Sequence, residues 1–306
     1  MCDTLLNQQR SSWPELSSGY EALESVRVRE IQCDGYSVKV QYNPRRLVST
    51  SAEVDERSVA GRRCFLCLDN LPTEQKGILY RDKFFILCNP APIFDRHLTI
   101  AHRDHTPQVL AGNLQVLLGL AKDLSPVFTV FYNGPKCGAS APDHLHFQAC
   151  PSGAIHVETD VVDPARRNLE HRIDKVSLYT MRNLGRPIVV VEGSDDSQLL
   201  KSFEALLATA RKVIRSEDEA MVNVLCSFAE EAWRLIVFFR RKHRPDMYFR
   251  EGDQRVMISP AAVDVGGLII APIEKDFERL DAGMVQQIYD EVILDQESLN
   301  HIVAAT

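Results

Sequence analysis

The stretch that most constrains this chain runs from residue 128 to residue 150, with the sequence FTVFYNGPKCGASAPDHLHFQAC. It begins with an apolar and aromatic run, Phe128 to Tyr132, which predicts a strand. A loop with glycines, prolines and small residues follows, from Asn133 to Pro142. The alternation from His144 to Gln148 then predicts a second strand, because side chains two residues apart share one face. The sequence therefore predicts a strand–loop–strand unit with a polar face.

That polar face carries two imidazoles and an amide. The alternation places five side chains on two faces: His144, His146 and Gln148 on one, and Leu145 and Phe147 on the other, toward the core. An unprotonated imidazole is a good nucleophile toward phosphorus and forms a covalent intermediate. The non-bridging phosphate oxygens need donors, and the loop offers backbone N–H groups, the Ser140 hydroxyl and the Lys136 ammonium. The pattern favours phosphate chemistry over a strand face turned to water, where Lys, Glu and Thr are more usual.

The same stretch resembles the signature of the histidine triad superfamily, in its transferase branch. That branch includes galactose-1-phosphate uridylyltransferase, the dinucleoside tetraphosphate phosphorylases and the GDP-hexose phosphorylases. The run HLHFQA is most similar to the last group, and GPKCGAS to the tetraphosphate phosphorylases. The resemblance implies that His146 attacks the α-phosphorus and becomes nucleotidylated, and that Gln148 steadies the phosphate. It also implies three loop positions that hold the nucleotide phosphates, Asn133, Gly138 and Ser140.

A pair of cysteines, Cys64 and Cys67, precedes this unit in the run RRCFLCLDN. The spacing lets two thiolates bind one metal ion, but it is equally compatible with two half-buried thiols. A thioredoxin-like redox pair is disfavoured, because no βαβ pattern surrounds the cysteines. The resemblance to the uridylyltransferases implies a structural zinc ion held by Cys64, Cys67, His105 and His144, with His102 as the alternative third ligand. His97 is expected in the core or in a supporting position, without a catalytic role.

A basic run, Arg240-Arg241-Lys242-His243-Arg244, follows the predicted strand from Trp233 to Phe239. In a chain of net charge −7, such a cluster indicates either an anion site or a solvated charged loop. We prefer Arg240 and His243 as phosphate-binding members.

The predicted fold is α+β, with two related histidine-triad-like units, each an antiparallel sheet flanked by helices. NPAPIFDRHLTIAHRD begins at Asn89 and is similar to SPAAVDVGGLIIAPIE, which begins at Ser259, an offset of 259 − 89 = 170 residues. We expect residues 1–165 to form the catalytic half with an N-terminal extension. Residues 166–306 would form a second, permuted half that lacks a nucleophile, because it has no His-x-His-x-Gln.

Composition narrows the function classes. The net charge of −7 argues against a dedicated nucleic-acid binder, and no apolar run approaches the ~20 residues of a membrane span. The first residues lack the order of a signal peptide, so we expect a cytoplasmic protein whose eight cysteines are reduced thiols or metal ligands.

The resemblance implies a nucleotidyltransferase or phosphorylase, a monomer or homodimer, that acts on a nucleotide sugar or dinucleotide. Its acceptor would be phosphate or a sugar phosphate. A hydrolase of the histidine triad type, in which water is the acceptor, is one alternative. Gln148 disfavours it, because the hydrolase branch usually has a third histidine there. A non-catalytic nucleotide-binding protein is the other alternative.

Overall fold

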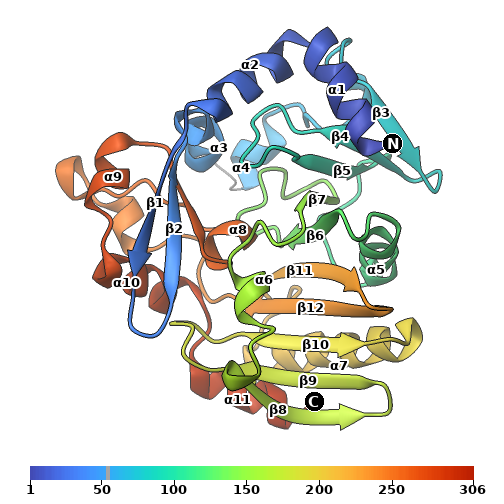
Figure 1. The fold of residues 1–306 in the computed structure, drawn as a ribbon, viewed down its shortest axis with the longest axis vertical. Helices are drawn as coiled ribbons and strands as arrows, with labels where there is room; N and C mark the ends of the chain where they lie inside the picture. Colours follow the sequence, from blue (N-terminus) through green and yellow to red (C-terminus); the bar gives the residue numbers. More distant parts are fainter. Residues whose placement is uncertain (53–55) are drawn as a thin grey trace.

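A ten-stranded antiparallel sheet dominates the structure, a computed structural model that describes residues 1–52 and 56–306. Figure 1 shows its strands stacked from β3 and β4 at the top to β8 at the bottom. In spatial order they are β3 (Gly77–Tyr80), β4 (Phe84–Cys88), β5 (Leu98–His102), β7 (His146–Pro151), β6 (Phe128–Asn133), β11 (Val222–Ala229), β12 (Ala232–Phe239), β10 (Val189–Gly193), β9 (Val176–Met181) and β8 (Arg167–Ile173). A smaller sheet contains β1 (Arg27–Gln32), β2 (Ser37–Tyr42) and β13 (Leu268–Ala271), and in it β13 runs parallel to β2.

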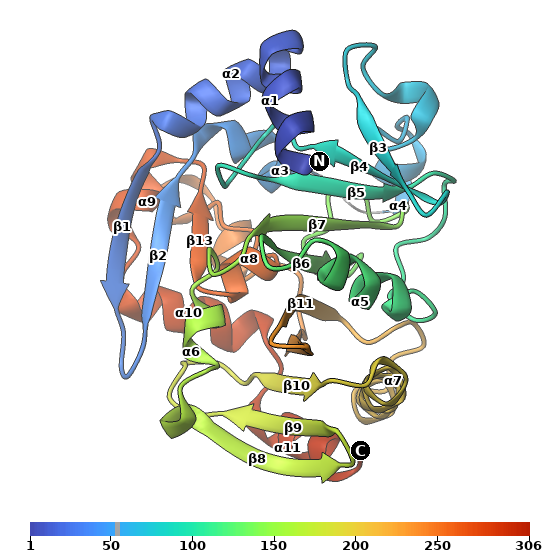
Figure 2. The same cartoon turned by 45° about the vertical axis from the view of Figure 1, so that its right-hand side comes forward.

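Helices lie on both faces of the large sheet and at its upper end (Figures 1 and 2). The described part of the chain contains α1 (Cys2–Ser12), α2 (Pro14–Glu24), α3 (Leu47–Ser51), α4 (Glu56–Ala60), α5 (Leu114–Asp123), α6 (Val157–Asp160), α7 (Asp196–Val213), α8 (Ala262–Val265), α9 (Glu274–Arg279), α10 (Ala282–Val292) and α11 (Gln296–Ala304). Short 3-10 turns are η1 (Pro44–Arg46), η2 (Leu68–Asn70), η3 (Pro164–Arg166), η4 (Asp246–Phe249) and η5 (Gly252–Gln254). Within the same residues, no helix combines the length and apolarity that crossing a bilayer requires.

The large sheet consists of two similar groups of five strands, which confirms the expected α+β fold with two related units. The first group has the order β3-β4-β5-β7-β6 and the second the order β8-β9-β10-β12-β11, and β6 pairs with β11 where the groups meet. A helix connects the third and fourth strand of each group in sequence, α5 in the first and α7 in the second. The second unit therefore repeats the first without permutation.

The sequence match at an offset of 170 residues does not mark this repeat, so the expected permutation is corrected. Its first copy contains β5, in the large sheet, whereas its second copy contains β13, which pairs with β2 in the small sheet. By strand order, β10 is the counterpart of β5, and β12 is the counterpart of β7. Similar apolar runs after a proline account for the match, because buried strands of unrelated position share that composition. Division of the chain after residue 165 stays a prediction.

The two faces of the large sheet bury separate cores. On one face, Val130, Tyr132, Leu235 and Val237 pack in a cluster with side chains of α5, α7 and α11. On the other face, Phe131, Leu225, Ile236 and Phe238 pack in a second cluster with α8, α10 and the small sheet. In Figure 2, α5 and α7 lie to the right of the large sheet, and the small sheet lies to its left.

Side-chain and loop contacts set where two of the helices begin. The helix α5 begins only at Leu114, because the Thr106 carbonyl oxygen accepts from the Leu145 N–H and the Leu110 N–H donates to the Glu219 carboxylate. The segment after β13 forms two helices, α9 and α10, and the side chain of Asp281 caps the second.

Candidate active site

A cavity of about 500 Å³ opens on the face of the large sheet that carries the second core. Its floor includes four side chains from β6 and β7, namely Phe131, Asn133, His146 and Gln148. In the second strand group the same face is covered, because Ile236 and Phe238 of β12 pack in the core beneath α8 and α10. The cavity therefore occurs in the unit whose strands present polar side chains.

His146 has a defined tautomer in this cavity. Its Nδ1 lies 2.8 Å from the backbone carbonyl oxygen of His144. A carbonyl oxygen can only accept a hydrogen bond, so Nδ1 carries the proton and Nε2 keeps its lone pair. Burial lowers the pKa of His146 to about 4, while the bond to the His144 carbonyl opposes that change. The imidazole is therefore neutral at physiological pH, with an unprotonated nitrogen available for attack.

A second buried histidine, His97, fixes the orientation of Gln148. The backbone N–H of Ile93 donates to Nδ1 of His97 (3.2 Å), so the ring proton is on Nε2. Nε2 lies 2.9 Å from Oε1 of Gln148 and donates to it. This bond leaves the amide N–H₂ of Gln148, which lines the cavity, as a donor for a ligand. Burial, with the charge of Arg46, lowers the pKa of His97 to about 3, so the ring stays neutral.

The side chain of Gln108 separates β6 from β7 at the end of the strand pair where His146 lies. β6 and β7 pair from Phe128↔Pro151 to Phe131↔Gln148, and the ladder stops there. Gln108 bridges the gap, accepting from the backbone N–H of His146 (2.7 Å) and donating to the carbonyl oxygens of Asn133 (2.8 Å) and His146 (3.0 Å). Sequence reasoning missed Gln108, because nothing near it in the chain indicates that it reaches two strands.

The loop between β6 and β7 lies against the α8 segment and requires a glycine. Gly138 has a φ of +90°, and a Cβ atom there would lie 2.6 Å from Cβ of Ala261. Both features exclude other residues without strain. Asn133 is fixed by two donors to its Oδ1, the Asn223 amide and the Ala262 N–H, both at 2.8 Å. Asn133, Gly138 and Ser140 all line the cavity.

The four predicted metal ligands lie together beside the cavity. The ligand atoms of Cys64, Cys67, His105 and His144 are all within 4.8 Å of one another. Nδ1 of His144 is 3.3 Å from the Cys64 sulfur, and Nδ1 of His105 is 3.1 Å from the Cys67 sulfur. Two thiols and two imidazoles are soft and borderline donors, and such a set fits a metal ion with tetrahedral coordination.

Neighbouring groups orient the two histidine ligands toward the sulfurs. Nε2 of His144 donates to the carbonyl oxygen of His102 (2.7 Å), which leaves Nδ1 as the metal-facing atom. Nε2 of His105 lies 3.3 Å from a carboxylate oxygen of Asp143. His102 thus contributes only its backbone carbonyl oxygen to this arrangement. Its ring atom Nδ1 lies within hydrogen-bond distance of the backbone of Asp104, outside the cluster. His144 precedes β7 and does not share the face of His146 and Gln148, which corrects the expectation of three polar groups side by side.

Two of the predicted phosphate ligands lie away from the cavity. Lys136 is exposed and pairs with Asp218 at 3.0 Å. Arg240 is 1% exposed, and its guanidinium donates to five protein acceptors: Asn223 Oδ1 and the carbonyl oxygens of Pro260, Val292, Lys242 and His243. These hydrogen bonds hold in place the segment that follows β12. Arg240 is therefore not assigned a role in binding a ligand. His243, three residues further, does line the cavity.

Four arginines, three of them outside the basic run that the sequence singled out, make the cavity cationic. Among the described residues, its charged lining consists of Arg45, Arg46, Arg62, Arg244, Glu15 and Asp264. Burial raises the pKa of Asp264 to about 6, although both of its oxygens accept backbone N–H groups. Four arginines and two acids, in a chain of net charge −7, concentrate positive charge at the nucleophile.

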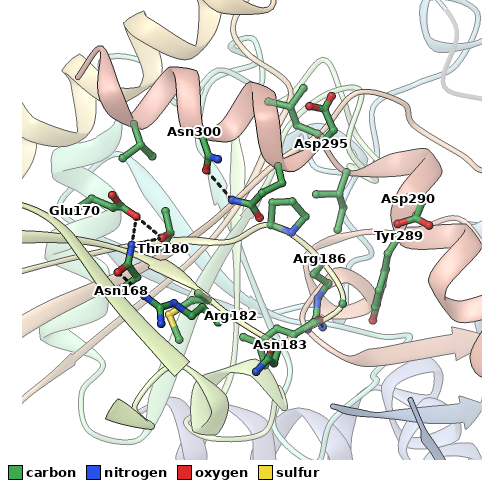
Figure 3. A pocket seen from close by; sticks show the side chains of 18 of the residues that line it. Asn168, Glu170, Thr180, Arg182, Asn183, Arg186, Tyr289, Asp290, Asp295 and Asn300 are labelled. Carbon is green, nitrogen blue, oxygen red and sulfur yellow. Dashed lines mark hydrogen bonds between the residues drawn. The ribbon is translucent and has the colours of Figure 1, made fainter. Parts of the chain in front are cut away.

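A wider cavity of about 1170 Å³ lies at the other end of the sheet, among β8, β9, α10 and α11. Figure 3 shows that Asn168 and Thr180 are both hydrogen-bonded to Glu170. The amide of Asn300 also accepts a hydrogen bond from Gln296. None of the predicted site residues lines it. The smaller cavity, which holds the oriented imidazole, is therefore the candidate active site.

Comparisons with known proteins agree with this assignment of fold. A family model described as a domain of unknown function (DUF4922) matches residues 5–151. No curated protein sequence matches the chain. The solved structure of yeast Ap4A phosphorylase Apa2 is similar over 92% of this chain and 96% of its own, with a TM-score of 0.62 and 16% identity.

Two further structures of the same yeast enzyme are also similar. Its complex with Ap4A has a TM-score of 0.58 at 13% identity, covering 92% of this chain and 96% of that one. Its complex with AMP has a TM-score of 0.57 at 15% identity, covering 94% and 96%. The chain therefore has the fold of this yeast phosphorylase, which agrees with the fold that its sequence resemblance implied.

Proposed function

We propose that this protein transfers a nucleoside monophosphate through a covalent intermediate on His146. The observation that carries the proposal is the pairing of an unprotonated Nε2 on His146 with an oriented amide donor on Gln148, in one cationic cavity. A neutral imidazole is nucleophilic toward phosphorus, and the amide offers a hydrogen bond to a non-bridging oxygen where negative charge is concentrated.

The first step forms a bond between Nε2 of His146 and the α-phosphorus of the substrate. The bond from that phosphorus to the bridging oxygen breaks, and its electron pair leaves with the departing phosphate. In the second step an oxygen of the acceptor attacks the same phosphorus, and the P–N electron pair returns to Nε2. The proton stays on Nδ1 throughout, and Nδ1 donates it in a hydrogen bond to the His144 carbonyl oxygen, which stabilises the positive charge that develops on the ring.

The Cys₂His₂ cluster fits zinc in a structural role. Cys64, Cys67, His105 and His144 would hold the ion, which would supply a fixed link between the 64–67 loop and the segment that precedes β7. The carbonyl of His144 in turn orients His146, so the cluster supports the nucleophile from outside the cavity. The ion takes no part in either chemical step.

A nucleotide sugar or a dinucleotide is the proposed donor. The HLHFQA run favours a nucleoside diphosphate sugar, and the fold shared with a phosphorylase crystallised with Ap4A and AMP favours a polyphosphate-linked dinucleotide. Both present an α-phosphorus with a phosphate leaving group. Apolar side chains in the lining of the cavity, including Trp13, Phe65 and Leu71, offer contacts for a nucleobase.

The test combines product analysis with detection of the intermediate. The protein is incubated with nucleoside diphosphate hexoses and with Ap4A, with and without phosphate, and products are separated by ion-exchange chromatography. We expect phosphate-dependent release of a nucleoside diphosphate, and a nucleotidyl adduct by intact mass that disappears in His146→Ala. Release of the monophosphate without phosphate identifies a hydrolase, and binding without turnover identifies a non-catalytic protein. An adduct that survives His146→Ala refutes the proposal.

A further inference from the structure

The amide of Gln108 takes the place of a hydrogen bond between two strands. The ladder of β6 and β7 ends with the pair of Phe131 and Gln148. In the same register, two residues further, Asn133 lies opposite His146, and every second pair of an antiparallel ladder exchanges N–H···O bonds directly. Here Oε1 of Gln108 accepts from the His146 N–H (2.7 Å), and its Nε2 donates to the Asn133 carbonyl oxygen (2.8 Å). The amide is therefore inserted between the two strands.

The second strand group contains the same ladder without an insertion. By strand order, β11 and β12 are the counterparts of β6 and β7. They pair continuously over eight residues each, from Val222↔Phe239 to Ala229↔Ala232, and a short turn joins them at the end that corresponds to the His146 end. The interruption therefore belongs to the strand group that carries the imidazole, and it is not a general property of this sheet.

The inserted amide moves the two strands apart at the floor of the cavity. In a regular ladder, opposite side chains have Cβ atoms about 4.5–5.5 Å apart, which leaves no room for another group between them. An imidazole that attacks a phosphoryl group needs its nitrogen about 3–3.5 Å from the phosphorus. Asn133 and His146 both line the cavity, so the widened gap between them opens into it. The room for a phosphoryl group beside His146 therefore depends on the inserted amide.

A residue of the second strand group helps to hold Gln108 in this position. Gln108 is 1% exposed, and its carbonyl oxygen lies 3.1 Å from the Tyr132 hydroxyl. Just after it, the N–H groups of Leu110 and Ala111 donate to the Glu219 carboxylate (2.9 and 2.7 Å). The same carboxylate lies 3.2 Å from the Tyr132 hydroxyl. Because Glu219 precedes β11, the strand group without a nucleophile fixes the segment that shapes the site of the other group.

We propose that Gln108 is a positioning residue for nucleotidyl transfer: its amide keeps Asn133 and His146 apart, so that the α-phosphoryl group of the donor fits between the imidazole and the opposite strand. The inference rests on the proposed function of His146. Without the amide, the His146 N–H and the Asn133 carbonyl oxygen lose their partners in a buried site, and the direct bond between them closes the gap. The loss should therefore slow the covalent step more than it weakens binding of the rest of the nucleotide.

Single-turnover kinetics of adduct formation test this role. Wild type, Gln108→Leu and a control, Trp233→Phe, are mixed with increasing concentrations of the nucleoside diphosphate hexose or Ap4A that loads wild type, and the adduct is quantified by rapid-quench intact mass. The control also removes a buried donor to a backbone carbonyl, that of Leu118, but on the opposite face of the sheet.

The expected result is a loss of rate at the site and not of binding. The rate constant at saturating donor should fall at least about 100-fold in Gln108→Leu, and the half-saturating concentration should change less than about fivefold. In Trp233→Phe both values should stay within about threefold of wild type.

Gln108→Glu gives a signature that a merely structural role would not produce. A protonated carboxyl has an acceptor oxygen and an O–H donor, so it can replace the amide, whereas a carboxylate cannot donate to a carbonyl oxygen. Burial beside carbonyl oxygens raises the pKa of the introduced carboxyl. Adduct formation in this variant should be at least about tenfold faster at pH 5.5 than at pH 8.5, while wild type changes less than about threefold. The neighbouring titratable groups, His146, Tyr132 and Glu219, are present in both proteins, so the difference between the profiles reports the introduced carboxyl.

The outcomes separate this inference from the proposed function. An adduct that forms as fast in Gln108→Leu as in wild type overturns the positioning role and leaves the role of His146 intact. An equal loss of rate in Trp233→Phe also overturns it, because the loss then follows stability. No adduct in wild type overturns the proposed function and this inference with it. If Gln108→Leu does not fold, the pH profile of Gln108→Glu decides, and a profile parallel to that of wild type contradicts the positioning role.

Discussion

Lowering the pH tests the protonation state that the fold imposes on His146. Burial lowers its pKa from the ordinary value of 6.5 to about 4. At pH 5 a group with a pKa near 4 is about 90% neutral, whereas an unperturbed histidine is about 3% neutral. The rate of adduct formation at pH 5 should therefore be about 90% of its value at pH 7.5, and not about 30-fold lower.

The assay is rapid-quench intact mass spectrometry with a donor whose phosphates are all bridged, such as a nucleotide sugar. Such a donor has no phosphate that titrates between pH 5 and pH 8, so a change in rate reports the enzyme. His97, with a pKa of about 3, keeps the Gln148 amide oriented over the same range. A rate that falls with a midpoint near pH 6.5 refutes the buried, neutral nucleophile.

The same pKa difference also makes the folded protein less stable as the pH falls. The folded-state pKa of His146 is below the unfolded-state value, so the unfolded chain binds more protons once the pH falls below 6.5. Stability should therefore decrease by about 1.4 kcal/mol for each pH unit between 6.5 and 4 from this residue alone. Urea unfolding at pH 7.5 and 5.5 measures the loss. His146→Gln is the control and should lose about 1.4 kcal/mol less than wild type between those values.

Three further predictions concern groups that surround the nucleophile. Cys64→Ser should remove a bound metal ion, which elemental analysis detects as about one equivalent per chain in wild type; equal metal content in both proteins contradicts the cluster. Gly138→Ala should destabilise by about 1–3 kcal/mol and weaken nucleotide binding, because the new Cβ meets Ala261 at a φ of +90°; unchanged thermal unfolding argues against that contact. Arg240→Met should lower the free energy of unfolding by about 3 kcal/mol or more, because it leaves buried acceptors without a hydrogen-bond donor. As the control, Lys136→Ala at an exposed position should change it by less than about 0.5 kcal/mol. Chemical denaturation measures both, and similar values for the two variants would contradict the assignment of one as buried and the other as exposed.

Strand-level features of the site could be read from the sequence because they are local. The apolar run that begins at Phe128 and the alternation around His146 each predict a strand, and β6 and β7 form at these positions. The alternation could not show where pairing begins. β7 pairs with β5 only from His146 onward, so His144 lies before the strand and turns its ring toward Cys64.

Features that depend on distant segments could not be read from the sequence. A basic run identifies charges but not their burial, so Arg240 and Arg244 look alike in sequence while one is enclosed and the other lines the cavity. Arg46 and Gln108 have no local pattern that indicates their role, because each reaches the site through contacts formed by the fold. The repeat was mislocated for a similar reason: strand order, which defines it, is a property of pairing and not of composition.

Locating the covalent nucleotide on the chain tests the central claim most directly. The protein is loaded with a donor, digested at alkaline pH to protect the acid-labile P–N bond, and sequenced by electron-transfer tandem mass spectrometry. The account predicts one nucleoside monophosphate on His146, whose Nε2 is the unprotonated nitrogen in the cavity. A nucleotide on any other residue, or steady turnover with no adduct at His146, contradicts it.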